Sequence, residues 1–165
     1  MQNELLTLGQ LAKILDEEEH RLIHLCERGV IIPAEDAQGR GTVRRFDANN
    51  LFCFAVALEI QRWGGQVTVL RPVIALLVQV IRLASKRQTG WSVCRFFADH
   101  EVCRLTYFKP NVVVFRTENQ FRTLALNEDG MPQPDTEQVE WPAGHASCVT
   151  IDLQAIASDL LTKMT

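Results

Sequence analysis

The sequence predicts an α+β fold in which helices come first and a small antiparallel sheet follows. From residue 7 to about residue 84, apolar residues recur at the three-to-four-residue spacing of amphipathic helices. From residue 103 the pattern changes to the alternation that is typical of strands, with turn residues between the runs. A last helical stripe over residues 153–164 ends the sequence. We therefore expect a helical N-terminal part, a C-terminal sheet and at least one helix that covers it.

Two short helices are expected first. Thr7 is a favourable N-cap and Gln10 stands at the capping-box position, so a helix of about two turns begins here. Asp16 can cap a second helix, whose positive end favours the three glutamates at positions 17–19. Gly29 supplies the left-handed residue that often ends a helix, and the proline four residues later cannot continue one.

A two-stranded wing is expected behind these helices. Residues 39–41 form a Gly-Arg-Gly turn, and the run from Thr42 to Phe46 favours a strand. Two helices followed by a wing make a winged helix-turn-helix. Arg44 and Arg45 are adjacent on the strand, so one can reach outward to phosphate while the other braces the wing. An ordinary surface hairpin with solvated arginines is the alternative.

Two longer helices follow. Asp47 can cap a third helix, which Gly64-Gly65 ends, and Thr68 starts a fourth with Pro72 in its first turn. From Val69 to Ala84 apolar residues cover most of the circumference, so we expect burial on two sides. One side would pack on its own chain and the other on a second subunit, unless a second domain covers both. The expected subunit contacts are Leu70, Val73, Ile74, Leu77 and Ile81.

The C-terminal part follows a linker at residues 86–90. We expect strands over residues 103–108, 111–116, 121–126 and 147–151. Asp152 can cap the final helix. This organisation predicts an N-terminal unit at 1–67, a linking or dimerisation helix at 68–89, and a small α+β domain at 90–165 that binds an effector or a partner.

Composition indicates a cytoplasmic protein. The 165 residues are 47% hydrophobic, and the five cysteines form no CxxC pair, which fits reduced thiols. No charged segment followed by an apolar stretch opens the sequence, so we expect no signal peptide. The most apolar run, residues 73–80, is too short to span a bilayer, so no membrane association is expected.

Three motifs resemble the MerR family of bacterial transcription regulators. They are Leu-Thr-Leu-Gly-Gln-Leu-Ala at 6–12, Glu-Arg-Gly-Val-Ile-Ile-Pro at 27–33, and Arg-Arg-Phe-Asp at 44–47 followed by Leu51. The resemblance covers roughly residues 5–66. It implies a homodimer that binds a pseudo-palindromic site in double-stranded DNA, with the second helix in the major groove and the wing on the backbone. In this family a further helical pair leads to a dimerisation helix.

The residues expected to contact DNA lie on the first two helices and the wing. They are Thr7, Gln10, Arg21, His24, Arg28, Arg40, Thr42, Arg44 and Arg45. Two features depart from the family pattern. Residues 24–26 read His-Leu-Cys where the family commonly has Arg-Tyr-Tyr, and residues 16–19 are all acidic, which would repel phosphates.

These departures support an alternative function in another class. Residues 1–67 carry seven Lys or Arg and ten Asp or Glu, for a net charge of −3. The unit could therefore keep the winged fold and bind the basic surface of a protein partner through its acidic second helix.

Other kinds of site are not expected. His20 and His24 have a metal-binding spacing with Glu17 or Glu27, but no third strong ligand has motif spacing, and Cys94, His100 and Cys103 fit no common zinc pattern. We expect no metal and no cofactor. No nucleophile has a matching base and no phosphate-binding glycine motif occurs, so an enzyme is not expected. A ligand pocket or a plain core could be built from the aromatic residues Trp91, Phe96, Phe97, Tyr107, Phe108, Phe115 and Trp141.

Overall fold

The computed structural model describes residues 5–36, 43–86, 91–99, 103–108, 112–117, 121–125 and 148–165. The chain has the expected α+β architecture. Its helices are α1 (Leu8–Leu15), α2 (Glu19–Glu27), α3 (Ala48–Arg62), α4 (Val67–Ser85), α5 (Val93–Ala98) and α6 (Leu153–Lys163). Its strands are β1 (Cys103–Phe108), β2 (Val112–Thr117), β3 (Phe121–Ala125) and β4 (Cys148–Asp152).

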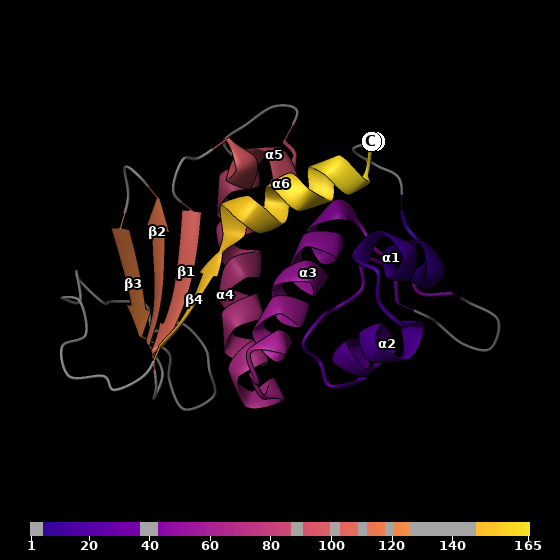
Figure 1. Cartoon of the computed structure of the whole chain (residues 1–165), viewed down its shortest axis with the longest axis horizontal. Helices are drawn as coiled ribbons and strands as arrows, with labels where there is room; N and C mark the ends of the chain where they lie inside the picture. Colours follow the sequence, from indigo (N-terminus) through magenta and orange to yellow (C-terminus); the bar gives the residue numbers. More distant parts are fainter. Residues whose placement is uncertain are drawn as a thin grey trace.

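The α3–α4 pair occupies the middle of the molecule (Figure 1). Helices α1 and α2 lie on one side of this pair, and the sheet lies on the other (Figure 1). Helices α5 and α6 pack against each other and against α3. The pair therefore joins the helix-turn-helix part of the chain to the sheet part.

Three expected N-caps are confirmed. Thr7 and Gln10 form a reciprocal capping box at the start of α1. Asp47 forms a second capping box with Asn50 at the start of α3. The Asp152 side chain accepts a hydrogen bond from the Ala155 amide at the start of α6. In each case a side chain satisfies an amide that the first helical turn leaves without a partner, which explains why the helices begin there.

The expectation that Asp16 caps α2 is wrong. Asp16 has left-handed dihedral angles, φ 54° and ψ 49°, and ends α1 instead. The tight turn between the helices needs one left-handed residue, and aspartate tolerates that conformation better than most residues. Glu18 is the N-cap of α2, and its side chain makes no capping hydrogen bond.

The position of Pro72 also differs from the expectation. Helix α4 begins at Val67, so Pro72 is its sixth residue and lies in the second turn, where it is buried. It therefore removes one interior hydrogen bond that a first-turn proline would not. The helix continues to Ser85 through extensive burial of its other apolar side chains.

Two glycines make the turn between α3 and α4. Gly64 has a φ of +80°, which favours glycine. Gly65 is required for a different reason, because a Cβ atom there would lie 2.3 Å from Ile60 Cγ2 and 2.8 Å from the Ile60 carbonyl oxygen. The Gly65 amide also donates to that carbonyl, at 2.9 Å. The backbone thus doubles back directly onto the last turn of α3.

The sheet is antiparallel throughout, with the strand order β3-β2-β1-β4. Cys103 pairs with Thr117, Arg104 with Asp152, and Val112 with Ala125. All four expected strands are confirmed to within one residue at each end. The period-two pattern was therefore sufficient to locate them.

One hydrophobic core runs through both parts of the chain. Phe97 of α5 is fully buried and stacks on Phe52 of α3, with ring centroids 4.6 Å apart and an interplanar angle of 8°. The sequence reasoning missed α5. Because of this contact, the boundary expected at residue 90 does not separate two cores. The aromatic side chains at 108, 115 and 141 lie outside the described part of the structure.

The five residues of α4 that were expected to contact a second subunit are covered by their own chain instead. Leu70, Val73, Ile74, Leu77 and Ile81 are all buried inside the same chain, at most 4% exposed. The alternative, that the chain itself covers them, is what the structure has. The next helix, α5, has only six residues, so no long helix directly follows the α3–α4 pair as the resemblance implied. The expected homodimer stays a prediction.

By length and composition alone, α4 could cross a membrane, since it has 19 residues and a mean hydropathy of 1.9. The expectation that no segment is long enough to span a bilayer considered only residues 73–80, the most apolar part of α4. A buried core helix passes the same test, and α4 packs against α3 with seven of its residues buried.

Candidate nucleic-acid interface

A short backbone arrangement attaches the wing to the rest of the N-terminal unit. Leu6 and Phe46 exchange two backbone hydrogen bonds, at 2.7 and 3.0 Å. Glu35 and Arg45 do the same on the other side, at 3.1 and 2.9 Å. Residues 45–46 are therefore held between the chain that enters α1 and the chain that leaves α2. Arg40 and Thr42, two of the expected DNA contacts, lie outside the described residues.

The two wing arginines take different roles. Phe46 is fully buried, so strand alternation directs Arg45 to the opposite face, away from the core. Arg44 instead forms an ion pair with Asp36, with Nε 3.1 Å from Oδ1. Burial raises the pKa of the Cys26 thiol in α2 to about 11, and the nearby Arg44 charge opposes that rise. Arg44 thus braces this segment through Asp36, while Arg45, which is also half-buried, lies on the face opposite Phe46.

The outward face of α2 carries few positive charges. Leu22 and Leu25 are buried, which turns His20, His24 and Glu27 toward solvent. The exposed Arg28 at the end of the helix donates from Nε to His24 Nε2 at 3.2 Å. These side chains can exchange hydrogen bonds with a partner, but they do not form a basic stripe.

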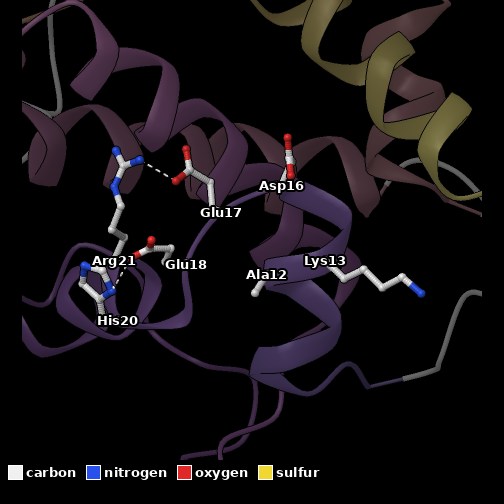
Figure 2. Close-up of a pocket in the computed structure, with 7 residues that line it drawn as sticks. All are labelled: Ala12, Lys13, Asp16, Glu17, Glu18, His20 and Arg21. Carbon is white, nitrogen blue, oxygen red and sulfur yellow. Dashed lines mark hydrogen bonds and ion pairs between the residues drawn. The ribbon is translucent and has the colours of Figure 1, made fainter.

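Glu17 is directed into the protein rather than toward a partner. Its side chain is only 9% exposed and pairs with Arg21 in α2 and with Arg62 in α3, the latter at 3.6 Å. Figure 2 shows the Glu17 carboxylate joined to the Arg21 guanidinium. Arg21, an expected DNA contact, is therefore partly committed to an internal ion pair. The two ion pairs neutralise Glu17, and through Glu17 they link Arg21 of α2 to Arg62 of α3.

The other three acidic residues of this turn differ among themselves. Glu19 lies against α1, since a Cβ atom at Gly9 would be 3.2 Å from its carboxylate oxygen. That position is near the positive end of α1, where a carboxylate is stabilised. Glu18 contacts His20 at 2.9 Å, and both side chains are about three-quarters exposed. Asp16 is exposed at the same turn (Figure 2). All three side chains are thus exposed, and Glu19 differs from the other two because it lies against α1.

Thr7 and Gln10 are already engaged at the start of α1. The Thr7 amide donates to Gln10 Oε1 at 2.7 Å, and the Gln10 amide donates to Thr7 Oγ1 at 3.2 Å. Their side chains therefore stabilise the helix first. A contact from either to DNA would have to use the remaining hydroxyl or amide hydrogens.

Two side chains that the sequence reasoning missed connect this unit to the central helices. Arg71 of α4 donates two hydrogen bonds to the Arg28 carbonyl oxygen at the end of α2, from Nε at 2.7 Å and from Nη2. Asn50 of α3 donates to the Ile32 carbonyl and accepts from the Ala34 amide, both at 2.9 Å. An arginine within the most apolar helix was the only sequence signal for the first of these links.

No metal-binding cluster of three or more His, Cys, Asp or Glu occurs among the residues that the structure describes. Burial raises the pKa of the Cys53 thiol to about 12 and that of Cys94 to about 11. Both thiols are buried in the core, which is the cause of each rise in pKa.

Comparison of the chain with models of known protein families and with curated proteins finds no match in either. The resemblance to the MerR family therefore depends on the three sequence motifs and stays a prediction.

Proposed function

We propose that this chain is a DNA-binding transcription regulator, similar to the MerR family, that binds a pseudo-palindromic site as a homodimer. The observation that carries the proposal is the joint placement of α1, α2 and the bridged residues 45–46, with Arg45 on the face opposite the buried Phe46. Two short helices with a wing beside them are a frequent way to present a helix to the major groove.

Each part of this surface would have a different role. Arg45 would bind a backbone phosphate, a contact that positions the protein but does not depend on sequence. His20 and His24 would lie toward base edges from the outward face of α2, where they can donate or accept hydrogen bonds. Arg28 would bind the backbone near the end of α2.

The distribution of acidic residues is compatible with this proposal. Four consecutive carboxylates facing DNA would oppose binding strongly. Glu17 is neutralised inside the protein. Asp16, Glu18 and Glu19 remain exposed, but Glu19 lies beside the positive end of α1, which partly offsets its charge. We therefore expect weaker binding than a basic unit would give, with affinity supplied by two copies of the unit.

The direct test is fluorescence anisotropy with random duplex DNA, titrated with salt, on the wild type and Arg45→Ala. Losing one phosphate contact per subunit should lower the slope of log K against log salt by about 0.9 for each contact. Arg95→Ala is the matched control, because Arg95 is exposed on α5 and carries the same charge. Binding that is absent at low salt, or equal slopes for all three proteins, would contradict the proposal.

Dimer formation needs its own measurement, because the α4 stripe is buried. Sedimentation equilibrium over a range of protein concentrations should give a reversible monomer–dimer association. A species that stays monomeric both alone and on DNA would exclude the pseudo-palindromic homodimer.

The alternative function, a protein-interaction module, is favoured by one observation. Asp16 and Glu18 are exposed at the turn between α1 and α2, where a shallow hollow lies (Figure 2). A basic protein surface would bind there by charge complementarity. The double substitution Asp16→Lys/Glu18→Lys should abolish such binding, whereas under the DNA proposal it should strengthen retention on heparin at low salt.

A further inference from the structure

A groove of about 580 Å³ lies between α4 and the segment that follows α2. One wall is the outward face of α4, where residues 71, 75, 78, 82 and 85 recur at helical spacing. The first and last of them are 14 steps apart along the helix, or about 21 Å at about 1.5 Å per residue. The other wall is residues 29–34, and the first turns of α3 close the side. This volume lies within the range of small-molecule sites, roughly 300–1,000 Å³.

The groove has an apolar interior and an apolar edge. Ile31, Cys53 and Ile74 contribute side chains that are no more than 2% exposed. Val78 and Ile32 line the rim and are 39% and 79% exposed. Because Asn50 fixes the Ile32 carbonyl and the Ala34 amide, the rim is held in place. A rigid apolar surface of this kind favours an apolar ligand.

The charged groups of the groove favour an anion. Arg82 is exposed along it and makes no ion pair within the described part of the chain. Gln79 lies within one turn of Arg82 and offers a side-chain amide donor, whereas the Ser85 hydroxyl already donates to the Arg82 carbonyl at 3.0 Å. The Asp47 carboxylate also lines the groove, but it accepts hydrogen bonds from the Asn50 amide at 2.8 Å and from Asn49 Nδ2 at 3.1 Å. Among the described residues that line the groove, Asp47 is the only carboxylate, and it is already engaged.

We propose that this groove binds a small amphipathic anion, an apolar acid whose hydrocarbon part lies on the groove floor and whose carboxylate pairs with Arg82. Arginine suits this role because its planar guanidinium can bind a carboxylate through two hydrogen bonds. The occupant is a small molecule rather than a second copy of the chain, because the charged group stands beside a concave apolar floor and not on a flat apolar face.

Ligand binding in the groove would act on the end of α2, because both walls of the groove are attached to it. Arg71 of the α4 wall donates to the Arg28 carbonyl at the end of α2, and residues 29–34 of the other wall continue directly from α2. A ligand that touches both walls stabilises one spacing between them. This regulatory consequence rests on the proposed DNA-binding function, whereas ligand binding does not.

The test uses 8-anilinonaphthalene-1-sulfonate, an apolar anion whose fluorescence rises in apolar sites, with decanoate as competitor. We expect saturable binding that decanoate displaces and that decanol, its uncharged counterpart, displaces less well. Arg82→Ala should weaken probe binding about tenfold, the effect of losing one charge-assisted hydrogen-bonded pair. Ala75→Phe, which fills the groove, and Val78→Asp, which places a negative charge in it, should abolish binding.

Two control variants keep the test specific. Arg95→Ala removes an exposed arginine elsewhere, and Leu83→Ala removes an exposed apolar side chain of α4 that does not line the groove. Both should bind the probe like the wild type. Thermal melting must show that every variant is folded. Because Arg82→Ala, Ala75→Phe and Val78→Asp change three different side chains, one misfolded variant does not decide the result.

Three results would overturn the proposal. Unchanged probe binding in Arg82→Ala and Ala75→Phe would place the probe elsewhere. Equal competition by decanol and decanoate would exclude an anion site. Sedimentation that shows a dimer lost in Val78→Asp, with the probe bound only by monomers, would assign the groove to a second copy. A shift of DNA affinity by decanoate tests the regulatory consequence separately, so its failure leaves the ligand site standing.

Discussion

The α3–α4 pair has two different interfaces with the rest of the molecule. Toward the sheet part it is held by apolar packing, with the Phe52–Phe97 stack at its centre. Toward α1 and α2 it also buries apolar side chains, but three polar links join the elements: Arg71 to the Arg28 carbonyl, Asn50 to residues 32 and 34, and Arg62 to Glu17. Competing groups can replace polar links one at a time, whereas a packed core is lost as a whole.

This difference indicates where the molecule can change shape. A ligand or DNA phosphate that competes for one of the polar links could move the helix-turn-helix without disturbing the core. Movement on the sheet side would have to separate stacked rings and expose apolar surface. We therefore expect the sheet part and α3–α4 to behave as one body, and the end of α2 to be the adjustable region.

The largest expected effect is on the apolar interface. Phe97→Ala removes a fully buried ring and should lower the free energy of unfolding by about 3–5 kcal/mol. Urea denaturation followed by circular dichroism measures this, with Leu83→Ala as an exposed control. Two separate unfolding transitions, with the one for the helix-turn-helix part unaffected, would show that the two parts unfold independently and do not share one core.

Alkaline pH should weaken both sides together. Burial raises the pKa of Cys53 in α3 to about 12 and of Cys94 in α5 to about 11, above the usual value of 9.0. Because the unfolded thiols ionise first, stability is fully present below pH 9 and is lost as pH rises toward 11–12, by an amount on the order of 2 kcal/mol. Urea midpoints between pH 8 and 11 test this. A Cys94→Ala variant should lose part of the pH dependence, and an unchanged slope would contradict the cause given.

The polar interface should give a smaller and more local effect. Arg71→Gln removes a charged donor from the Arg28 carbonyl and should cost about 1 kcal/mol, since the link is partly exposed to water. Amide hydrogen exchange should become faster in residues 26–30 and stay unchanged in α6. Arg104→Gln, at an exposed pair on the sheet side, is the matched control. Equal acceleration throughout the chain would mean that Arg71 supports the core rather than one link.

The smallest effect is expected at the turn between α1 and α2. Asp16 has a left-handed backbone, so Asp16→Gly should raise stability by roughly 0.5–1 kcal/mol. Asp16→Asn tolerates the same conformation and removes a charge, so under the DNA proposal it should increase affinity without that gain. Thermal melts and anisotropy separate the two effects. Lower stability for Asp16→Gly would show that the carboxylate has a structural role.

Much of the fold was predictable because its signals are local. The N-caps at Thr7, Asp47 and Asp152 and the strand alternation depend on residues close in sequence, and all are confirmed. Asp16 was misassigned because aspartate suits both an N-cap and a left-handed helix end, and sequence alone does not separate the two. Helix α5 was missed because six residues are too few to show a helical period.

The candidate site was less predictable because it depends on tertiary contacts. Strand alternation predicted that the two wing arginines would differ, but only the Asp36 pair shows that Arg44 is the bracing one. Likewise, an apolar helix does not specify what covers it, and only one face of α4 is covered by its own chain, while Val78 and Leu83 are exposed on the rest of the helix. The sequence indicated that all four acidic residues at 16–19 would repel DNA. The structure shows that one of them, Glu17, is directed inward and paired with two arginines.

The close approach of Gly65 to Ile60 has a consequence for reading mutational scans. Any Cβ atom at this position would lie under 3 Å from the Ile60 carbonyl oxygen and from Ile60 Cγ2, although the Gly65 backbone conformation is open to other residues. A complete substitution library should therefore show position 65 as almost invariant. Such intolerance, often taken as the mark of an active or binding residue, would here report only how closely the turn after α3 folds back onto Ile60.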